Sequence, residues 1–381
     1  MNFLLVVSAY FPVMCGYSTR LEGIVSNLAK LGHNVTILTP RRDKTMREIE
    51  QINSQITVIR YPYHGIISAP YLIWRIHKLL SLKRFDIVSG HSPTKCVLAT
   101  IIANLCHRLP IIHMMHYSPR SLELPKWSPK YWFWRIVDDF ILNHVDRVGV
   151  ISYTLRDELL KRGLSLNKVM VIPNGVDIRK FTPRRRDKRL EDKYNLKNKN
   201  VVMFLGRFQP WENLSSLVDI FLRVKACRND VVLMLVGDGP DKNVIERIIR
   251  KYELQGDVII TGFVPPEEVP RYYSLCDVFV MVRPDIPMLN LTTPIKPVEA
   301  MAMEKTIVST DVGGMREIIE DGKNGFLVSH SEEAISKKIL EVLADEKIRQ
   351  KIGTNARDYV LSNRDWSLIT EKFVKSIEGI V

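Results

Sequence analysis

Short apolar runs alternate with helical patterns along this chain, and that alternation limits its fold more than any other feature. A first series begins with the uninterrupted apolar run of residues 3–9, and a second series begins at residues 201–205. Continuous apolar runs are typical of parallel strands buried on both faces, and the segments between them repeat apolar residues at helical spacing. The sequence therefore predicts an α/β protein with two Rossmann-like domains.

The remaining strands and the domain boundaries follow from the same pattern. Residues 178–200 are polar and strongly charged, so we interpret them as a linker between domain 1–177 and domain 201–364. We expect the closing helix, 365–381, to pack back on the first domain. If the domains face each other, the carboxyl ends of their strands meet at one cleft, where such sheets bind ligands. Further strands are expected at 35–38, 87–89, 111–114, 148–151, 169–172, 231–236, 258–260, 278–281 and 307–309.

The positive charge of the chain is concentrated in its first half. Residues 1–180 hold 24 Lys and Arg against 12 Asp and Glu, whereas the other residues hold 31 against 30. A basic domain beside a neutral one suggests that the first domain meets something anionic, with nucleic acid and an acidic membrane surface as the two candidates. No nucleic-acid-binding module is recognisable, so we expect no nucleic acid partner.

The compartment is predicted from cysteine usage and hydropathy. The five cysteines are odd in number and widely spread, which favours free thiols in a reducing compartment. No apolar run reaches the length of about 18 residues that crosses a bilayer. The apolar start lacks a basic segment and a cleavage site, and therefore reads as a buried strand. We expect a cytoplasmic protein, with peripheral attachment to the cytoplasmic face of the membrane as an option.

The most specific motifs lie in the second half. Residues 297–317 read PVEAMAMEKTIVSTDVGGMRE and residues 321–328 read DGKNGFLV. Together they resemble the retaining glycosyltransferases of family 4, the two-domain GT-B enzymes also called glycosyl transferases group 1. The first domain matches this family more loosely. Shorter matches follow the family order: PNGVD at 173–177, FLGR at 204–207, GDGP at 237–240, TGFV at 261–264 and CDVF at 276–279.

The resemblance implies a site for a nucleotide-sugar donor, a UDP-sugar or a GDP-sugar. Arg207 matches the family arginine that faces the diphosphate, where fixed cations stabilise the leaving group. The family usually has a lysine five residues later, but this chain has Glu212. We expect Lys296, and with it Arg283, to supply the missing charge. The alternative is that both cations are solvated loop residues.

Glu299 matches the carboxylate with which the family holds the donor ribose, and a carboxylate accepts hydrogen bonds from both hydroxyls of a diol. A helix-terminal charge is the minor alternative. The first glutamate of the family's paired motif is replaced by Leu291, so recognition of the sugar differs. Val264 falls in a matching segment and is expected near the donor.

Two positions of the first domain match the family more weakly. Gly16 follows the first strand, where a glycine lets the backbone approach phosphates, although an ordinary turn is nearly as good an interpretation. His116 matches the active-site histidine that contacts the transferred sugar or the acceptor. We interpret His113 as a buried histidine.

We expect no metal and no cofactor besides the donor substrate. The chain has no Asp-x-Asp pattern, with which metal-dependent transferases hold a cation at the diphosphate. The implied mechanism is front-face hexose transfer with retention at the anomeric carbon, through an oxocarbenium-like transition state.

The acceptor side is predicted from two aromatic and basic stretches, 63–84 and 126–135. Cations beside amphipathic aromatic rings suit an interface with anionic lipids, which indicates a lipid-linked or saccharide acceptor at a membrane surface, in polysaccharide or glycolipid biosynthesis. The alternative is core aromatic residues beneath a solvated basic face. Two rival functions stay open: an altered, non-catalytic protein that binds or regulates, and a sugar-nucleotide epimerase.

Overall fold

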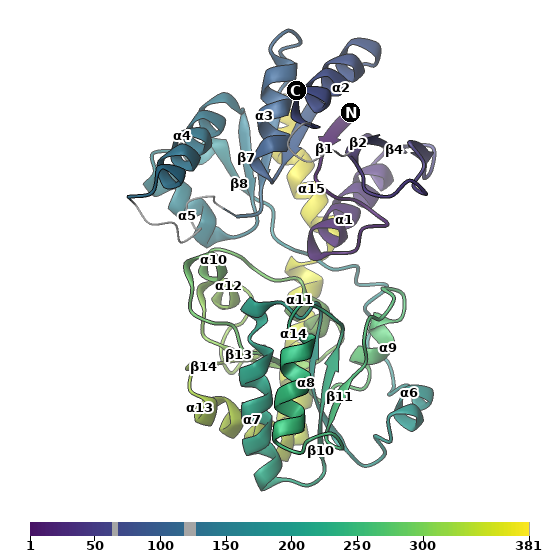
Figure 1. Cartoon of the computed structure of the whole chain (residues 1–381), viewed down its shortest axis with the longest axis vertical. Coiled ribbons are helices and arrows are strands. Elements are labelled where there is room, and N and C mark those ends of the chain that lie inside the picture. Colours follow the sequence, from purple (N-terminus) through teal and green to yellow (C-terminus); the bar gives the residue numbers. More distant parts are fainter. Residues whose placement is uncertain (63–67, 118–126, 381) are drawn as a thin grey trace. The chain divides into compact units, whose positions relative to one another are not determined.

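The computed structural model describes residues 1–62, 68–117 and 127–380, and these form two compact units. Unit 1 comprises Met1–Pro173 together with Trp366–Val381, and unit 2 comprises Asn174–Asp365. Each unit is a sheet with helices on both faces, as Figure 1 shows. The α/β prediction with two Rossmann-like domains is therefore confirmed.

The sheet of unit 1 has eight strands in the order β3-β4-β2-β1-β5-β6-β7-β8. Its neighbours pair in parallel, except for the antiparallel pair β3 and β4. The strands are β1 (Asn2–Val6), β2 (Asn34–Arg41), β3 (Ile49–Gln51), β4 (Ile56–Pro62), β5 (Ile87–His91), β6 (Ile111–Met115), β7 (Arg147–Val150) and β8 (Val169–Val171). The helices are α1 (Gly16–Lys30), α2 (Ser68–Leu82), α3 (Thr94–Asn104), α4 (Pro129–His144), α5 (Tyr153–Lys161) and α15 (Trp366–Ile377).

Strand β1 is buried on both of its faces, which accounts for the uninterrupted apolar run at residues 3–9. Leu4 and Val6 pack in one hydrophobic cluster with residues of α2 and α3, while Phe3 and Leu5 pack in another cluster with α1 and α15. Alternate side chains of a strand point to opposite faces, so a strand covered on both sides has no polar position to offer. Burying each such side chain contributes about 1.5–3 kcal/mol.

The sheet of unit 2 has six strands in the order β11-β10-β9-β12-β13-β14, and all its neighbours pair in parallel. The strands are β9 (Asn200–Leu205), β10 (Val231–Val236), β11 (Val258–Ile260), β12 (Val278–Met281), β13 (Thr306–Thr310) and β14 (Phe326–Val328). The helices are α6 (Lys188–Lys193), α7 (Leu214–Cys227), α8 (Lys242–Lys251), α9 (Val269–Tyr273), α10 (Pro287–Asn290), α11 (Lys296–Ala302), α12 (Gly313–Arg316), α13 (Glu332–Ala344) and α14 (Glu346–Asn363), with a short 3-10 helix at Pro210–Glu212.

The last helix, α15, belongs to unit 1 and packs on α1, as Figure 1 shows in yellow and purple. Trp366 is buried at the start of α15, and a β-carbon at Gly23 of α1 would collide with its indole ring. The Arg20 guanidinium lies 5.7 Å from the centre of the same ring and donates to the carbonyl oxygens of Ile172 and Pro173. Burial lowers the pKa of Arg20 to about 9. These contacts fix α15 to the first sheet.

Residues 178–200, interpreted from the sequence as a linker, contain α6 and belong to unit 2 itself. Asp187 caps α6 by accepting a hydrogen bond from the backbone of Leu190, and it pairs with Arg271 at 2.8 Å. Arg186 contacts Asp277 at 3.4 Å. The compact part of unit 2 therefore begins at Asn174, before the charged segment. Among the helices that the structure describes, none is long and apolar enough to cross a membrane.

Candidate functional site

The carboxyl ends of the unit 2 strands gather the charged residues that the sequence singled out. Arg207 follows β9, Arg283 follows β12, and Lys296 begins α11. Because β9 and β12 are parallel neighbours in the sheet, their carboxyl ends, and the loops that follow them, lie side by side at one edge. Ligands of doubly wound sheets bind at this edge.

Lys296 is held on three sides within unit 2. Its ammonium forms an ion pair with Glu212 and lies 5.2 Å from the centre of the Phe204 ring. Its methylene chain passes over Gly206, where a β-carbon would collide with Lys296 Cε. Gly206 also has a φ of +146°, which L side chains rarely adopt. Glycine at 206 therefore makes room for this lysine.

Glu212 is buried, with 5% of its surface exposed, at the end of the 3-10 helix Pro210–Glu212. Its Oε1 accepts a hydrogen bond from Lys296 Nζ. Its Oε2 is also buried, and no described residue supplies a hydrogen bond to it. A buried carboxylate oxygen without a partner is costly, and so marks a position where a ligand or water can donate.

Arg283 interacts electrostatically with Glu212 and is likewise 5% exposed. Its Nη1 donates to the carbonyl oxygen of Thr292 at 3.3 Å, while its buried Nε finds no acceptor among the described residues. Burial lowers the pKa of Arg283, and the attraction of Glu212 opposes that shift. The structure therefore brings Lys296 and Arg283 together around Glu212, and neither is a solvated loop side chain.

Arg207 has a different environment. Its side chain is exposed and forms no ion pair with any residue in the described ranges. The strand β9 ends two residues before it, so the guanidinium stands at the same sheet edge as Lys296 but outside the buried cluster. Such an arginine is free to contact an anion.

Glu299 lies in the first turn of α11 and is half-buried. The Tyr273 hydroxyl donates to Glu299 Oε2 at 3.2 Å. Burial raises the pKa of Glu299 to about 7, while the Tyr273 hydrogen bond and the charges of Lys180 and Lys296 oppose that shift. Val264 follows β11 and packs, partly buried, against the core of unit 2.

In unit 1, Gly16 is the first residue of α1 and is exposed. A β-carbon there would meet nothing within 4 Å, so the protein's own packing does not require glycine. The turn is stabilised instead by Ser18, whose hydroxyl accepts from the Cys15 backbone amide at 3.0 Å.

His116 follows β6 and is half-buried, with an Nε2 atom that has no partner among the described residues. Its ring contacts the edge of Tyr17 with 4.8 Å between ring centres. Burial, with the charge of Arg20 and the nearby His91 and His113, holds the pKa of His116 well below its usual range. The imidazole is therefore neutral at physiological pH.

His113 is buried, as expected, with Nδ1 3.2 Å from the Gly90 carbonyl oxygen. Its burial lowers its pKa to about 4. Sequence reasoning missed His91, which stacks on His116 with 6.1 Å between ring centres. Its place at the carboxyl end of β5 was the available signal. Nowhere in the described ranges do three His, Cys, Asp or Glu side chains gather as metal ligands.

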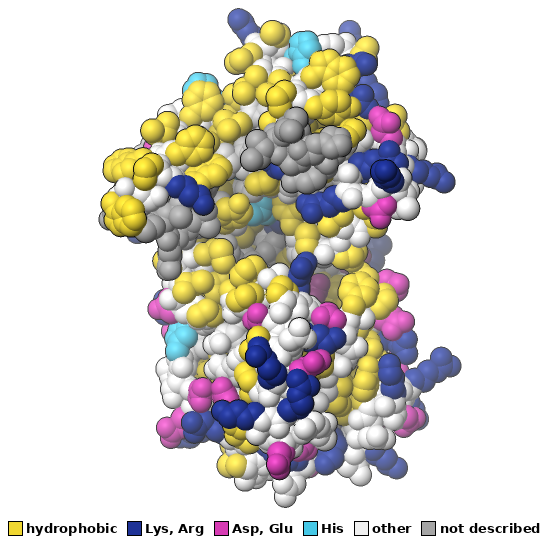
Figure 2. Space-filling view, viewed as in Figure 1, with side chains coloured by type: hydrophobic (Ala, Val, Ile, Leu, Met, Phe, Trp, Pro, Cys, Tyr) yellow, Lys and Arg dark blue, Asp and Glu magenta, His cyan; other side chains and the backbone are white. Residues whose placement is uncertain are grey.

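The two aromatic and basic stretches differ in exposure. In α2, Leu72, Ile76 and Leu79 enter the core, whereas Trp74 is exposed with Lys78 over its ring. The α4 face, which we define as Trp132, Phe133, Ile136 and Phe140, is 42–67% exposed. Figure 2 shows apolar side chains gathered over α4 with basic ones beside them. Residues 63–67 and Lys126 of these stretches lie outside the described residues.

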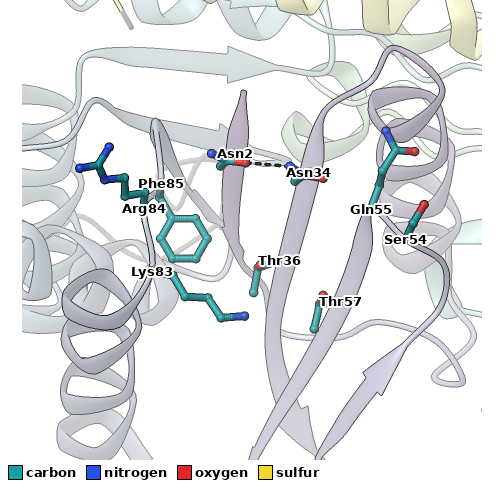
Figure 3. A pocket seen from close by; sticks show the side chains of 9 residues that line it. All are labelled: Asn2, Asn34, Thr36, Ser54, Gln55, Thr57, Lys83, Arg84 and Phe85. Atoms are coloured by element: carbon teal, nitrogen blue, oxygen red, sulfur yellow. Dashed lines mark hydrogen bonds between the residues drawn. The ribbon is translucent and has the colours of Figure 1, made fainter.

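A hollow of about 200 Å³ opens on unit 1 at the edge of the sheet that holds the amino ends of the parallel strands, opposite to their carboxyl ends (Figure 3). It lies at the amino ends of β1 and β2, where Asn34 donates to Asn2 at 2.9 Å, with Lys83 and Arg84 beside it. Ligand pockets typically occupy about 300–1,000 Å³. Both its size and its edge make it a poorer site than the carboxyl ends of the strands.

Comparisons with known proteins cover both halves of the chain. The family model "Glycosyltransferase Family 4" matches residues 15–180, and the model "Glycosyl transferases group 1" matches residues 186–359.

The chain is 23% identical to the alpha-monoglucosyldiacylglycerol synthase of Acholeplasma laidlawii, covering 98% of this chain and 94% of that protein. It is also 23% identical to the GDP-mannose-dependent alpha-(1-6)-phosphatidylinositol monomannoside mannosyltransferase of Mycolicibacterium smegmatis, covering 99% and 98%. The fold is similar to that of Anabaena HepE in complex with UDP-glucose, with a TM-score of 0.79, 20% identity and complete coverage of both chains.

Proposed function

The chain belongs to the group 1 glycosyl transferases of GT-B type, and from that premise we propose that it transfers a hexose from a UDP-sugar or GDP-sugar to a lipid-linked or saccharide acceptor. We further propose that the reaction retains the anomeric configuration and needs no metal. Each part has a separate support and a separate test.

One observation carries the donor proposal: Lys296, Arg283 and Arg207 stand at one edge of the unit 2 sheet. A nucleoside diphosphate leaving group gains negative charge as the glycosidic bond breaks. Preorganised cations at that position stabilise the transition state more than the ground state. The same cations support metal independence, because they offer the charge that a bound Mg²⁺ supplies elsewhere. Activity that survives EDTA is the expected result.

For the nucleotide end of the donor, we propose that Glu299 binds the ribose. An ionised carboxylate accepts two hydrogen bonds from the ribose hydroxyls. Anabaena HepE is seen in complex with UDP-glucose, and the M. smegmatis relative is GDP-mannose-dependent. We therefore propose both UDP-sugars and GDP-sugars as candidate donors.

For unit 1 we propose that His116 contacts the transferred sugar or the acceptor. A neutral imidazole with an open Nε2 accepts from or donates to a hydroxyl without adding charge to the site. Gly16, exposed at the start of α1, is proposed to lie against the donor phosphates. An alanine there is tolerated by the fold, so any loss of activity reports on the ligand.

The acceptor side is proposed to work at an anionic membrane surface. The A. laidlawii and M. smegmatis relatives are named for a glucosyldiacylglycerol product and a phosphatidylinositol mannoside substrate, both lipids. On this chain, the exposed α4 face lies beside Arg135, whose guanidinium is 5.2 Å from the centre of the Trp132 ring. Apolar rings with neighbouring cations combine burial in the lipid interface with attraction to anionic headgroups.

A panel of nucleotide sugars tests the donor first, by binding and by release of the nucleoside diphosphate. Transfer is then measured to diacylglycerol, phosphatidylinositol and glycan acceptors, and the anomeric configuration of the product is read by NMR. Transfer with retention supports the proposal. Binding without turnover favours the non-catalytic alternative, whereas conversion of one nucleotide sugar into another favours the epimerase.

A further inference from the structure

Glu212 has one oxygen in use and one that is not. Oε1 holds the ammonium of Lys296, and Oε2 is buried without a partner among the described residues. The side chain keeps only 6% of its surface exposed. A carboxylate held at such a place, with an open acceptor, is built to receive a hydrogen bond from a ligand.

The partner ammonium is equally incomplete. Lys296 has three N–H donors, of which Glu212 takes one, and its side chain is 21% exposed. The pair therefore presents donors beside an open acceptor at the carboxyl end of β9. A ligand that complements both carries an anionic oxygen close to a hydroxyl. A hexose bonded to a diphosphate has that arrangement.

We infer that Glu212 is a specificity-determining residue, which positions Lys296 for the diphosphate and accepts a hydrogen bond from a hydroxyl of the donor sugar through Oε2. The inference rests on the proposed function of this site as the donor site. It also supplies a recognition group for the sugar in a chain where the first glutamate of the family's paired motif is replaced by Leu291, whose side chain is apolar.

Arg283 offers a competing explanation for the open Oε2 of Glu212. Arg283 Nε is buried and lacks an acceptor, and Arg283 interacts electrostatically with Glu212, so a rearrangement that paired Nε with Oε2 would leave neither atom open. In that case Glu212 would be a purely structural partner of two cations. The two explanations differ in whether a substitution at Glu212 changes the contribution of a sugar hydroxyl to the binding free energy.

The test is a coupling cycle between the protein and the ligand. The binding constants of the nucleoside diphosphate, the preferred nucleotide hexose and its monodeoxy analogues are measured for the wild type and for Glu212→Gln. Glutamine keeps an oxygen for Lys296 but removes the charge. We expect diphosphate affinity to change by less than about threefold, and one deoxy analogue to lose about tenfold or more in the wild type but much less in the variant. Glu333→Gln, on the exposed first turn of α13, is the matched control.

Each outcome is decisive. Equal losses for the diphosphate and for every nucleotide sugar would make Glu212 structural, as would deoxy effects that are the same in both proteins. If Glu212→Gln does not fold, Glu212→Asp is used instead, because its shorter side chain cannot reach the same hydroxyl. Its affinities for the deoxy series are then compared with those of the wild type. A wild type that binds no nucleoside diphosphate would overturn the proposed function and this inference with it, whereas binding without the coupling would overturn this inference alone.

Discussion

The ammonium of Lys296 is paired with the buried carboxylate of Glu212, two residues that lie 84 positions apart in the chain. The same carboxylate also attracts the buried guanidinium of Arg283 and so favours its charged form. The cluster thus holds two cations around one anion, and Arg207 adds an exposed cation at the same sheet edge. A site with excess positive charge, partly shielded from water, is suited to a diphosphate.

The first prediction concerns the position of that charge. Lys296→Ala should weaken nucleoside diphosphate binding by about ten- to hundredfold, since it removes a charge-assisted contact and leaves the buried Glu212 without the ammonium that bonds its Oε1. The double variant Glu212→Lys with Lys296→Glu keeps the pair but exchanges the ends. We expect it to recover part of the loss, measured by calorimetry. Unchanged affinity in Lys296→Ala would remove this residue from the donor site.

A second prediction uses the pKa of Glu299. Because that pKa is raised to about 7 and only the ionised form accepts from both ribose hydroxyls, donor affinity should rise with pH through about 7 and level off above it. Tyr273→Phe removes a hydrogen bond that lowers this pKa, so the midpoint should move to higher pH. Glu299→Gln should flatten the profile. A profile that stays the same in Glu299→Gln would assign the titration to another group.

The third prediction tests the α4 face. Replacing Trp132, Phe133 and Ile136 by serine should lower binding to vesicles rich in anionic lipid by tenfold or more, because these side chains are at least 50% exposed in the protein. Binding should also weaken as salt is raised. Ile348→Ser, at an exposed apolar position of α14, is the matched control. Equal vesicle binding by the triple variant and the control would argue for a merely solvated face.

The fourth prediction concerns the attachment of α15 to unit 1. Trp366→Ala should lower the free energy of unfolding by about 3–5 kcal/mol, because it opens a cavity between Gly23 and Arg20. Trp127→Ala removes a ring that is 84% exposed and should change stability by less than about 0.5 kcal/mol. Urea unfolding followed by circular dichroism compares the two. Similar losses would mean that α15 contributes little to unit 1.

Local sequence was sufficient for most of the strands. The apolar runs at 3–9, 201–205 and 231–236 became β1, β9 and β10, because a strand covered on both faces needs apolar residues at every position. Strand β4 was missed because Arg60 interrupts its apolar pattern. In the structure Arg60 is 3% exposed and pairs with Glu50 of β3 at 2.7 Å, a compensation that only the neighbouring strand supplies.

For the candidate site, the sequence by itself determined which residue types stand at the strand ends, and through them it predicted the family and suggested the class of ligand. It predicted that Lys296 and Arg283 are cations near a diphosphate, which stays a prediction, and it offered no role for Glu212. Only the tertiary structure decided that Glu212 holds Lys296 and keeps a second oxygen open. The physical reason is that strand order, rather than distance along the chain, sets which loops meet at a sheet edge, and burial then determines which of their charges must pair.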